Sequence, residues 1–448
     1  MDLKRNVDSP ARGIGGLLER AFRLTEHGTS IRTELLAGLT TFLTMAYIVF
    51  VNPSILADAG MPRDAVFVAT CLVAALGSLI MGLYANYPIA LAPGMGLNAY
   101  FTYVVVQGLG FSWQAALGAV FISGLCFLII TLTGLRAIIV DGIPRSMRIA
   151  ITVGIGLFLA IIALKNAGLV TASPATFVTL GDLHQPGTVL AVIGFLMVAV
   201  LSARRVRAAL LSSILAVTVL SFAVAGNSFQ GIVSLPPAIA PTLFALDIQG
   251  ALSGGLLNVI LVLFLVELFD ATGTLMGVAN RAGLLTEGRM RRLDRALMAD
   301  SAAVFAGSLL GTSSTTAFLE SAAGVEEGGR TGLTAVTVAV LFLACLFFAP
   351  LAGAVPPYAT APALFYVACL MLSDLADLDW DDRTEVIPAC VTALLMPFTF
   401  SIATGVSCGF ITYAALKLLT GRGREVKPVV WVIAAIFLFK FVVVGGAH

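Results

Sequence analysis

The chain has 448 residues, of which 59% are hydrophobic and only 11% are charged, and its mean hydropathy is +1.00. A water-soluble domain carries about a quarter charged residues, so this composition excludes an ordinary soluble protein and indicates a polytopic membrane protein. Lys and Arg together number 26 against 25 for Asp and Glu, a formal net charge of +1, so no basic excess indicates binding to nucleic acid.

The first 32 residues are predicted to form a cytoplasmic N-terminal segment. Its basic residues are Lys4, Arg5, Arg12, Arg20, Arg23 and Arg32. Over residues 13–24, apolar side chains are interspersed with charges, which predicts an amphipathic helix lying on the inner membrane surface. A flexible tail is the alternative interpretation of the same pattern.

A helix needs ~20 mostly apolar residues to cross the hydrocarbon layer, and about fourteen such runs follow residue 33. The clearest are 34–52, 65–83, 113–133, 149–164, 188–202, 208–225, 256–279 and 331–349. Shorter or interrupted runs are 93–107, 297–310, 316–325 and 362–372. Two further runs meet near 400–405, and a last apolar segment, 429–444, has a direction through the membrane that the sequence leaves open.

The basic loops predict the orientation of the chain, because Lys and Arg beside short loops resist translocation. Counting spans from a cytoplasmic N-terminus places four basic loops on that same side: 136–148, 204–207, 281–295 and 422–427. We therefore expect a multi-pass protein of the inner cell membrane with its N-terminus in the cytoplasm.

Two breaks interrupt the apolar runs at corresponding places in the two halves of the chain. In residues 91–100, Pro93, Gly94 and Gly96 should end an extended stretch and begin a half-length helix. In residues 310–320, a glycine precedes hydroxyl residues that can cap a helix N-terminus. With about seven spans per half, the second copy would be inverted and the two half-helices would meet near the bilayer midplane. Breaks that merely allow close helix packing are the alternative.

Three acidic residues, Glu267, Asp270 and Glu320, interrupt apolar helices near these breaks. A carboxylate in mid-span costs about 2.5 to 3.5 kcal/mol on insertion, whereas a Leu or Val returns only about 0.3 to 0.6 kcal/mol, so acids retained there indicate function. Their spacing places Glu267, Asp270 and Thr274 on one helical face, which must look inward. The alternative is a packing role through bonds to helix backbones, and it is strongest for Glu267.

The chemistry of these groups indicates a transporter for a small planar molecule. An acid in low-dielectric surroundings can take up a proton in step with occupancy of a pocket, which is the physics of a proton symporter. Ionised carboxylates accept N–H bonds, Asn98 offers a donor and an acceptor, and N–H groups at half-helix starts bind carbonyl oxygens. A nucleobase presents such N–H and C=O groups along its edge, whereas an anion would be repelled by the acids.

The cysteines and histidines indicate neither a metal site nor a cofactor. The six cysteines are scattered singly without CxxC spacing, and His27, His184 and His448 are predicted to lie in loops or at the terminus. Motifs of metalloproteases and serine hydrolases are not expected. We therefore assign no catalytic residue, metal ligand or cofactor and do not expect an enzyme.

Several long motifs resemble, in order, those of the AzgA-like hypoxanthine, guanine and xanthine permeases of the nucleobase transporter superfamily. The motifs are residues 33–47 running into 51–53, then 92–101, 269–275, 311–325 and 328–333. The resemblance covers almost the whole chain. It implies an all-α inverted repeat of about 7+7 spans with two half-helices and short extended segments at the midplane. It also implies purine uptake driven by protons, an elevator-like displacement, and often a homodimer held through gate helices.

The resemblance further implies two interleaved domains. A core domain would consist of residues 33–135 and 250–352, and a gate domain of residues 136–228 and 353–420. Residues 421–448 would add a basic loop and the last apolar segment.

Site residues follow from the same motifs. Asp270 and Glu320 would clasp the base and exchange the proton, and Glu267 would support binding or proton coupling. The other residues that the resemblance places at the substrate are Gly96, Leu97, Asn98, Thr274, Phe318 and Leu319. Phe318 stands where an aromatic ring can stack on the base, and Thr274 where some relatives have a histidine. Alanine at 271 and the Ala-Phe-Leu run at 317–319 depart from the commoner pattern and would retune the preferred purine.

Other transport functions stay open at this point. A permease of the same fold could carry pyrimidine bases or anions. Sodium could replace the proton, because hydroxyl groups and unwound backbone carbonyls also suit sodium. A passive channel would move the substrate without any dependence on a pH gradient.

Overall fold

The computed structural model describes residues 14–134, 142–224, 231–252, 256–281, 283–286, 289–290 and 292–443. Within these residues, nine helices have the length and composition needed to cross a membrane. The prediction of a mostly helical, polytopic membrane protein is confirmed, and the total of about fourteen spans stays a prediction. Lys4, Arg5, Arg12, Arg136 and His448, on which parts of the sequence analysis rest, lie outside the described residues.

The first half of the chain consists of helices with one strand hairpin. Its elements are α1 (Ile14–Phe22), α2 (Ile31–Met45), α3 (Ile48–Asp58), α4 (Arg63–Ile80), the π-helix η1 (Met81–Ala85), β1 (Leu91–Pro93), α5 (Met95–Ala99), the π-helix η2 (Tyr100–Gly108), α6 (Trp113–Thr133), α8 (Arg145–Asn166), β2 (Val170–Ser173), β3 (Phe177–Leu180), α9 (Pro186–Ala203) and α10 (Ala209–Val224). The amphipathic helix predicted for residues 13–24 is present as α1.

The second half also consists of helices with short strands between them. Its elements are α11 (Ile248–Leu252), α12 (Leu257–Arg281), β4 (Leu285–Thr286), β5 (Arg289–Met290), α13 (Leu293–Leu310), β6 (Thr315–Ala317), α14 (Ser321–Glu326), α15 (Gly332–Cys345), η3 (Leu346–Phe348), α16 (Ala349–Ala354), α17 (Pro357–Leu372), η4 (Ser373–Asp377), α18 (Arg383–Phe398), α19 (Ile402–Leu419), η5 (Gly423–Glu425) and α20 (Pro428–Val443).

The two predicted breaks lie against each other. Strand β1 pairs with β6 in antiparallel register, with Leu91 opposite Ala317 and Pro93 opposite Thr315. Each strand is followed by a short helix, α5 running into η2 after β1, and α14 after β6. A proline can lie in this pair because the ladder is only three residues long, so few backbone bonds are lost. The expected extended segments and half-length helices are therefore present.

The second break differs from the expectation in one respect. The hydroxyl residues after Gly311 do not cap a helix, because Thr315 and Thr316 belong to strand β6. Helix α14 begins only at Ser321, and Glu320 is its N-cap residue rather than a residue inside it. Gly311 has φ = +89° and ends α13, which turns the chain toward the strand.

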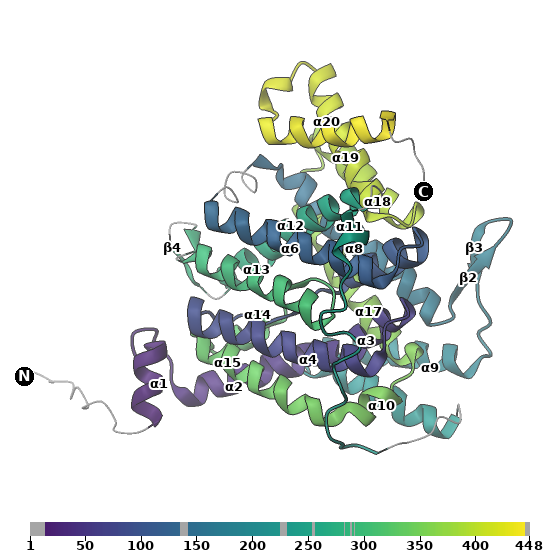
Figure 1. Cartoon of the computed structure of the whole chain (residues 1–448). Coiled ribbons are helices and arrows are strands. Elements are labelled where there is room, and N and C mark those ends of the chain that lie inside the picture. The colour runs from purple at the N-terminus through teal and green to yellow at the C-terminus, as the bar shows by residue number, and fades with distance from the viewer. Residues whose placement is uncertain are drawn as a thin grey trace, which may run out of the picture.

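Figure 1 shows α4, α6 and α13 running nearly parallel through the middle of the molecule, and α13 packs against both neighbours. Helix α15, from much later in the chain, packs on α2 and α4. A second group of contacts joins α8 to α17 and α18. The last apolar segment forms α20, which lies on α19 at the edge of the molecule.

Candidate functional site

Asp270 and Glu320 lie near each other in the structure. Helix α12 carries Asp270 and packs against β6 and α14, and Asp270 interacts electrostatically with Glu320. Both acids are partly exposed. Strand β6 and the start of α14 thus place Glu320 beside Asp270 of α12.

Glu320 is held by the break between α2 and α3. The phenol of Tyr47 donates a hydrogen bond of 2.6 Å to Oε1 of Glu320, and Tyr47 is fully buried. The hydroxyl of Thr44 donates to the carbonyl of Thr41 at 2.7 Å within α2 and lies 3.4 Å from the backbone oxygen of Glu320. The sequence analysis missed Tyr47 as a site residue, although it ends the motif at 33–47 and is a polar aromatic residue within an apolar run.

Backbone and side-chain bonds hold the paired strands in place. The amide of Phe318 donates to the carbonyl of Ala90 at 3.0 Å, and the amide of Ala90 donates to the hydroxyl of Ser321 at 3.0 Å. On the other side of the pair, the amide of Gly94 donates to the carbonyl of Ser314 at 2.9 Å. Because both ends of the pair are bonded, the start of α5 and the start of α14 have a fixed relation to each other.

Asn98 belongs to a buried amide network beside this site. Its Nδ2 donates to Oδ1 of Asn52 at 2.5 Å, and the hydroxyl of Ser313 donates to its Oδ1. Nδ2 of Asn52 in turn donates to Thr70 at 2.7 Å and to Thr312 at 3.0 Å. Asn98 therefore joins the two breaks through the interior, and a direct contact between Asn98 and a substrate stays a prediction.

The remaining predicted contact residues occupy three different settings. Gly96 approaches Ile155 of α8 so closely that a Cβ on the glycine would meet Cγ2 of the isoleucine. Leu97 and Phe318 are buried, whereas Leu319 is 44% exposed. Of the two residues that directly precede Glu320, Phe318 is thus enclosed by the protein, whereas much of the Leu319 side chain is exposed.

Glu267 faces a different helix from Asp270. It is buried, and its Oε2 accepts a hydrogen bond of 2.9 Å from Ser123 of α6. This contact lies in the packing between α6 and α12 and involves a side chain rather than a helix backbone, so the role of Glu267 in binding or proton coupling stays a prediction. Thr274, one turn beyond Asp270, is half-buried.

A further acid, Glu34, has a role that was not predicted from the sequence. Its fully buried carboxylate accepts bonds from the amides of Arg330 at 2.8 Å, Thr331 at 3.2 Å and Thr334 at 3.2 Å. It also accepts a bond of 2.6 Å from the hydroxyl of Thr334. Glu34 thus occupies the N-terminus of α15, where the helix dipole favours a negative charge. This explains the motif at 328–333 as an anchor between α15 and α2.

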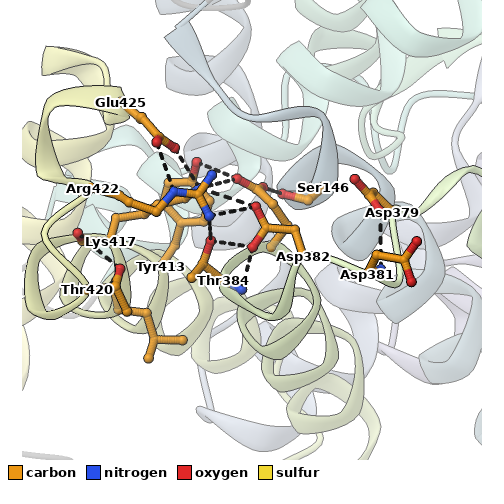
Figure 2. Close-up of polar contacts among 12 residues, drawn as sticks. Ser146, Asp379, Asp381, Asp382, Thr384, Tyr413, Lys417, Thr420, Arg422 and Glu425 are labelled. Carbon is orange, nitrogen blue, oxygen red and sulfur yellow. Dashed lines mark hydrogen bonds and ion pairs between the residues drawn. The ribbon is translucent and has the colours of Figure 1, made fainter.

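Figure 2 shows a second polar cluster, at the ends of α18 and α19. The buried Lys417 lies 2.8 Å from Glu385 and 3.1 Å from Glu425, and Arg422 lies 2.8 Å from both Asp382 and Glu425. A cavity of about 510 Å³ opens beside it, and neither Asp270 nor Glu320 lines this cavity. We interpret the cluster as a structural link between these helices and the segment that leads to α20.

The contacts in this cluster stabilise the ionised form of Asp382. The hydroxyl of Thr384 donates to Oδ1 of Asp382 at 2.7 Å, and Arg422 pairs with its Oδ2 at 2.8 Å. The Thr384 bond, followed by the Arg422 contact, lowers the pKa of Asp382 from its ordinary 3.8 to about 2.

One serine-hydrolase pattern does occur, contrary to expectation. Residues 405–409 read Gly-Val-Ser-Cys-Gly and match GxSxG. They lie inside α19, whereas a nucleophile needs a strand-to-helix turn that exposes its hydroxyl. Ser407 is buried and donates to the carbonyl of Ala403 at 2.7 Å, so it is part of helix packing.

Among the described residues, no group of three or more His, Cys, Asp and Glu side chains is arranged to hold a metal ion.

Comparison with known proteins identifies similar chains. The model of the Permease family (Xan_ur_permease) matches residues 32–408. The adenine permease AdeP of Escherichia coli is 50% identical over 432 residues, which cover 96% of this chain and 97% of AdeP. The guanine/hypoxanthine permease PbuO of Bacillus subtilis is 45% identical over 427 residues, which cover 94% of this chain and 99% of PbuO.

Solved structures show the same fold at much lower identity. The transmembrane domain of the cyanobacterial bicarbonate transporter BicA has a TM-score of 0.64 at 18% identity, covering 83% of this chain and 97% of that domain. Murine Slc26a9 in the inward-facing state has a TM-score of 0.64 at 11% identity, covering 94% of this chain and 74% of its own. This likeness confirms the predicted fold class, an all-α inverted-repeat transporter fold, while the number of spans stays a prediction.

Proposed function

Because the chain belongs to the Permease family and its near relatives are purine permeases rather than enzymes, we propose that it imports purine nucleobases by proton symport. The membership confirms the resemblance identified from the motifs. Adenine permeases and guanine/hypoxanthine permeases both occur among the relatives, so the proposal covers purines with either an amino or an oxo group at the same ring position.

The observation that carries the proposal is the approach of Asp270 on α12 to Glu320 before α14, beside the paired strands. Two carboxylates accept hydrogen bonds, and a purine offers N–H groups on its edge to match them. The same acids argue against the anions carried by a protein of similar fold such as BicA, because carboxylate and anion repel each other.

Proton coupling follows from the same pair of acids. Two negative charges near each other in apolar surroundings repel, and a proton on either acid removes that repulsion. A proton on one acid leaves the other ionised as the acceptor for a purine N–H. Proton uptake therefore favours purine binding, as symport requires.

We include an elevator movement of a core domain against a gate domain in the proposal. Packing supports this division, because α2, α4, α6, α13 and α15 contact one another, whereas α8 contacts α17 and α18. The proposed core and gate domains meet where Gly96 lies against Ile155. They meet again where Arg207, between α9 and α10, pairs with Glu327, after α14. A movement that carries α14 with the site would have to break the pair of Arg207 and Glu327.

Membrane orientation and assembly belong to the same proposal. The basic loops favour a cytoplasmic N-terminus in the cell membrane, and the gate helices are the expected surface of a homodimer. Labelling of single cysteines placed in the loop at 204–207 would check the orientation, since reagents that do not cross the membrane should leave them unlabelled from outside.

The test is uptake by purified protein in proteoliposomes. In sodium-free buffer with an alkaline interior, labelled adenine or hypoxanthine should accumulate, and a protonophore should abolish the accumulation. Unlabelled purines should compete, while uracil and bicarbonate should not. Accumulation that survives the protonophore but needs sodium would favour sodium coupling, and competition by bicarbonate instead of purines would favour an anion permease.

A further inference from the structure

Tyr47 lies at the point where the first long helical segment of the chain is interrupted. Helix α2 ends at Met45 and α3 begins at Ile48, so Tyr47 occupies the break between them. Its side chain is fully buried, and its phenol lies 2.6 Å from Oε1 of Glu320, 273 residues further along the chain. A buried phenol that donates to a carboxylate makes a strong, charge-assisted hydrogen bond.

The side-chain hydrogen bond to the carboxylate of Glu320 comes from Tyr47, on a distant helical segment. Glu320 is the N-cap residue of α14, yet its side chain makes no capping bond there. The side chain of Glu320 is thus tied to the break between α2 and α3.

We propose that Tyr47 is a positioning residue for substrate binding. By holding Oε1 of Glu320, the phenol restricts the carboxylate to one rotamer and leaves Oε2 as the acceptor for a purine N–H. A carboxylate that is already fixed loses less rotamer freedom when the purine binds, which strengthens binding without any contact between Tyr47 and the purine. This inference rests on the proposed function, because it assigns to Glu320 the role of substrate acceptor.

Tyr100 provides a matched control for the removal of one phenol. It is almost as buried as Tyr47, at 1% exposed, and it lies at the junction of α5 and η2 near the other break. Within the described part of the chain, its hydroxyl has no hydrogen-bond partner. Tyr100→Phe therefore removes a buried hydroxyl without breaking a bond, whereas Tyr47→Phe breaks the bond to Glu320.

The experiment is purine uptake by proteoliposomes containing Tyr47→Phe or Tyr100→Phe. Tyr47→Phe should raise KM by about tenfold, because the freed carboxylate must lose its rotamer freedom when the purine binds, with Vmax within about twofold of wild type. Tyr100→Phe should leave both constants unchanged. A wild-type KM for Tyr47→Phe overturns the inference, and so does an equal rise of KM in both variants.

A double-mutant cycle tests whether Tyr47 acts through Glu320. Glu320→Asp shortens the side chain by one methylene and withdraws the carboxylate from the phenol. In that background, Tyr47→Phe should add less than about twofold to KM, because coupled residues are not additive. A full additional tenfold effect would mean that Tyr47 acts independently of Glu320, contrary to the inference.

Two further measurements keep the outcomes separate. If the Tyr47→Phe protein is produced only in small amounts, its dissociation constant for adenine can still be measured by thermal stabilisation of the purified protein. This constant should rise about tenfold relative to wild type. An unchanged constant overturns the inference. Wild-type uptake by Glu320→Gln would refute the proposed function itself, whereas loss of uptake in Glu320→Gln with no effect of Tyr47→Phe refutes only the role of Tyr47.

Discussion

The carboxylate of Glu34 and the hydroxyl of Thr334 lie 2.6 Å apart, although 300 residues separate them in the chain. Glu34 is near the start of α2 and Thr334 is in the first turn of α15, so the bond joins the first long helix of one half to a helix of the other. Three backbone amides of the same segment also donate to this carboxylate. The side chain of Glu34 thus caps the N-terminus of α15.

Replacement of Glu34 should destabilise the protein. Glu34→Ala leaves several buried donors without an acceptor, and we expect the free energy of unfolding to fall by at least about 3 kcal/mol. The thermal midpoint of the detergent-solubilised protein measures this loss. Glu26→Ala is the control, because the side chain of Glu26 is 65% exposed. Equal midpoints for the two variants would show that the buried bonds contribute little.

The two acids of the candidate site should be indispensable for transport. Asp270→Asn and Glu320→Gln preserve the shape of the side chains but remove the charge, so we expect purine uptake to be lost while expression stays intact. Initial uptake rates at equal protein in proteoliposomes give the measurement. Thr274→Ala, one turn from Asp270, should change affinity only modestly. Wild-type-like uptake by either acid variant would remove that residue from the site.

The close approach of Gly96 to Ile155 should restrict residue 96 to glycine. A methyl group on Gly96 would collide with Cγ2 of Ile155, and overpacking of this kind costs about 1 to 3 kcal/mol, so Gly96→Ala should lower uptake by roughly tenfold. Ile155→Ala removes the colliding atom and should restore uptake in the double variant. Gly353→Ala is a suitable control, because a Cβ on Gly353 would meet no atom within 4 Å. Failure of the double variant to recover would mean that the collision is not the cause.

The low pKa of Asp382 should make its contribution to stability dependent on pH. Its ordinary pKa is 3.8 and its folded pKa is about 2, so the folded state favours the ionised form. The contribution is therefore complete above about pH 4 and is lost as the pH falls through about 2. Fluorescence of the exposed Trp380, in the same loop, can follow acid unfolding.

Comparison of wild type with Asp382→Asn isolates this contribution from that of other acids. The variant should be less stable than wild type at neutral pH, and the difference should shrink between about pH 4 and pH 2. Asp381→Asn, whose side chain is exposed, should follow the wild-type curve. A difference between Asp382→Asn and wild type that stays constant down to pH 2 would contradict the assigned cause.

Hydropathy and local residue types determine most of the architecture. The helices at 113–133 and at 209–224 occur where apolar runs of sufficient length stand in the sequence, because a helix in a membrane must satisfy its own backbone bonds. Pro93 and Gly311 mark the two breaks, since Pro93 ends strand β1 before the helix α5 and Gly311 ends the helix α13. The order of motifs also identifies the family, and Asp270 and Glu320 stand out because acids are costly in apolar helices.

Only the tertiary structure decided which polar groups meet. Tyr47 with Glu320, Glu34 with Thr334, and Asn98 with Ser313 are pairs separated by more than 200 residues. No local pattern specifies such pairs, because each depends on how two distant helices pack and on which atoms then lie within about 3 Å of each other. The same holds for Glu267, whose spacing placed it with Asp270, but whose carboxylate accepts its bond from Ser123 on a neighbouring helix. Periodicity determines the face of a helix, whereas the neighbour on that face is determined by the packing of the whole chain.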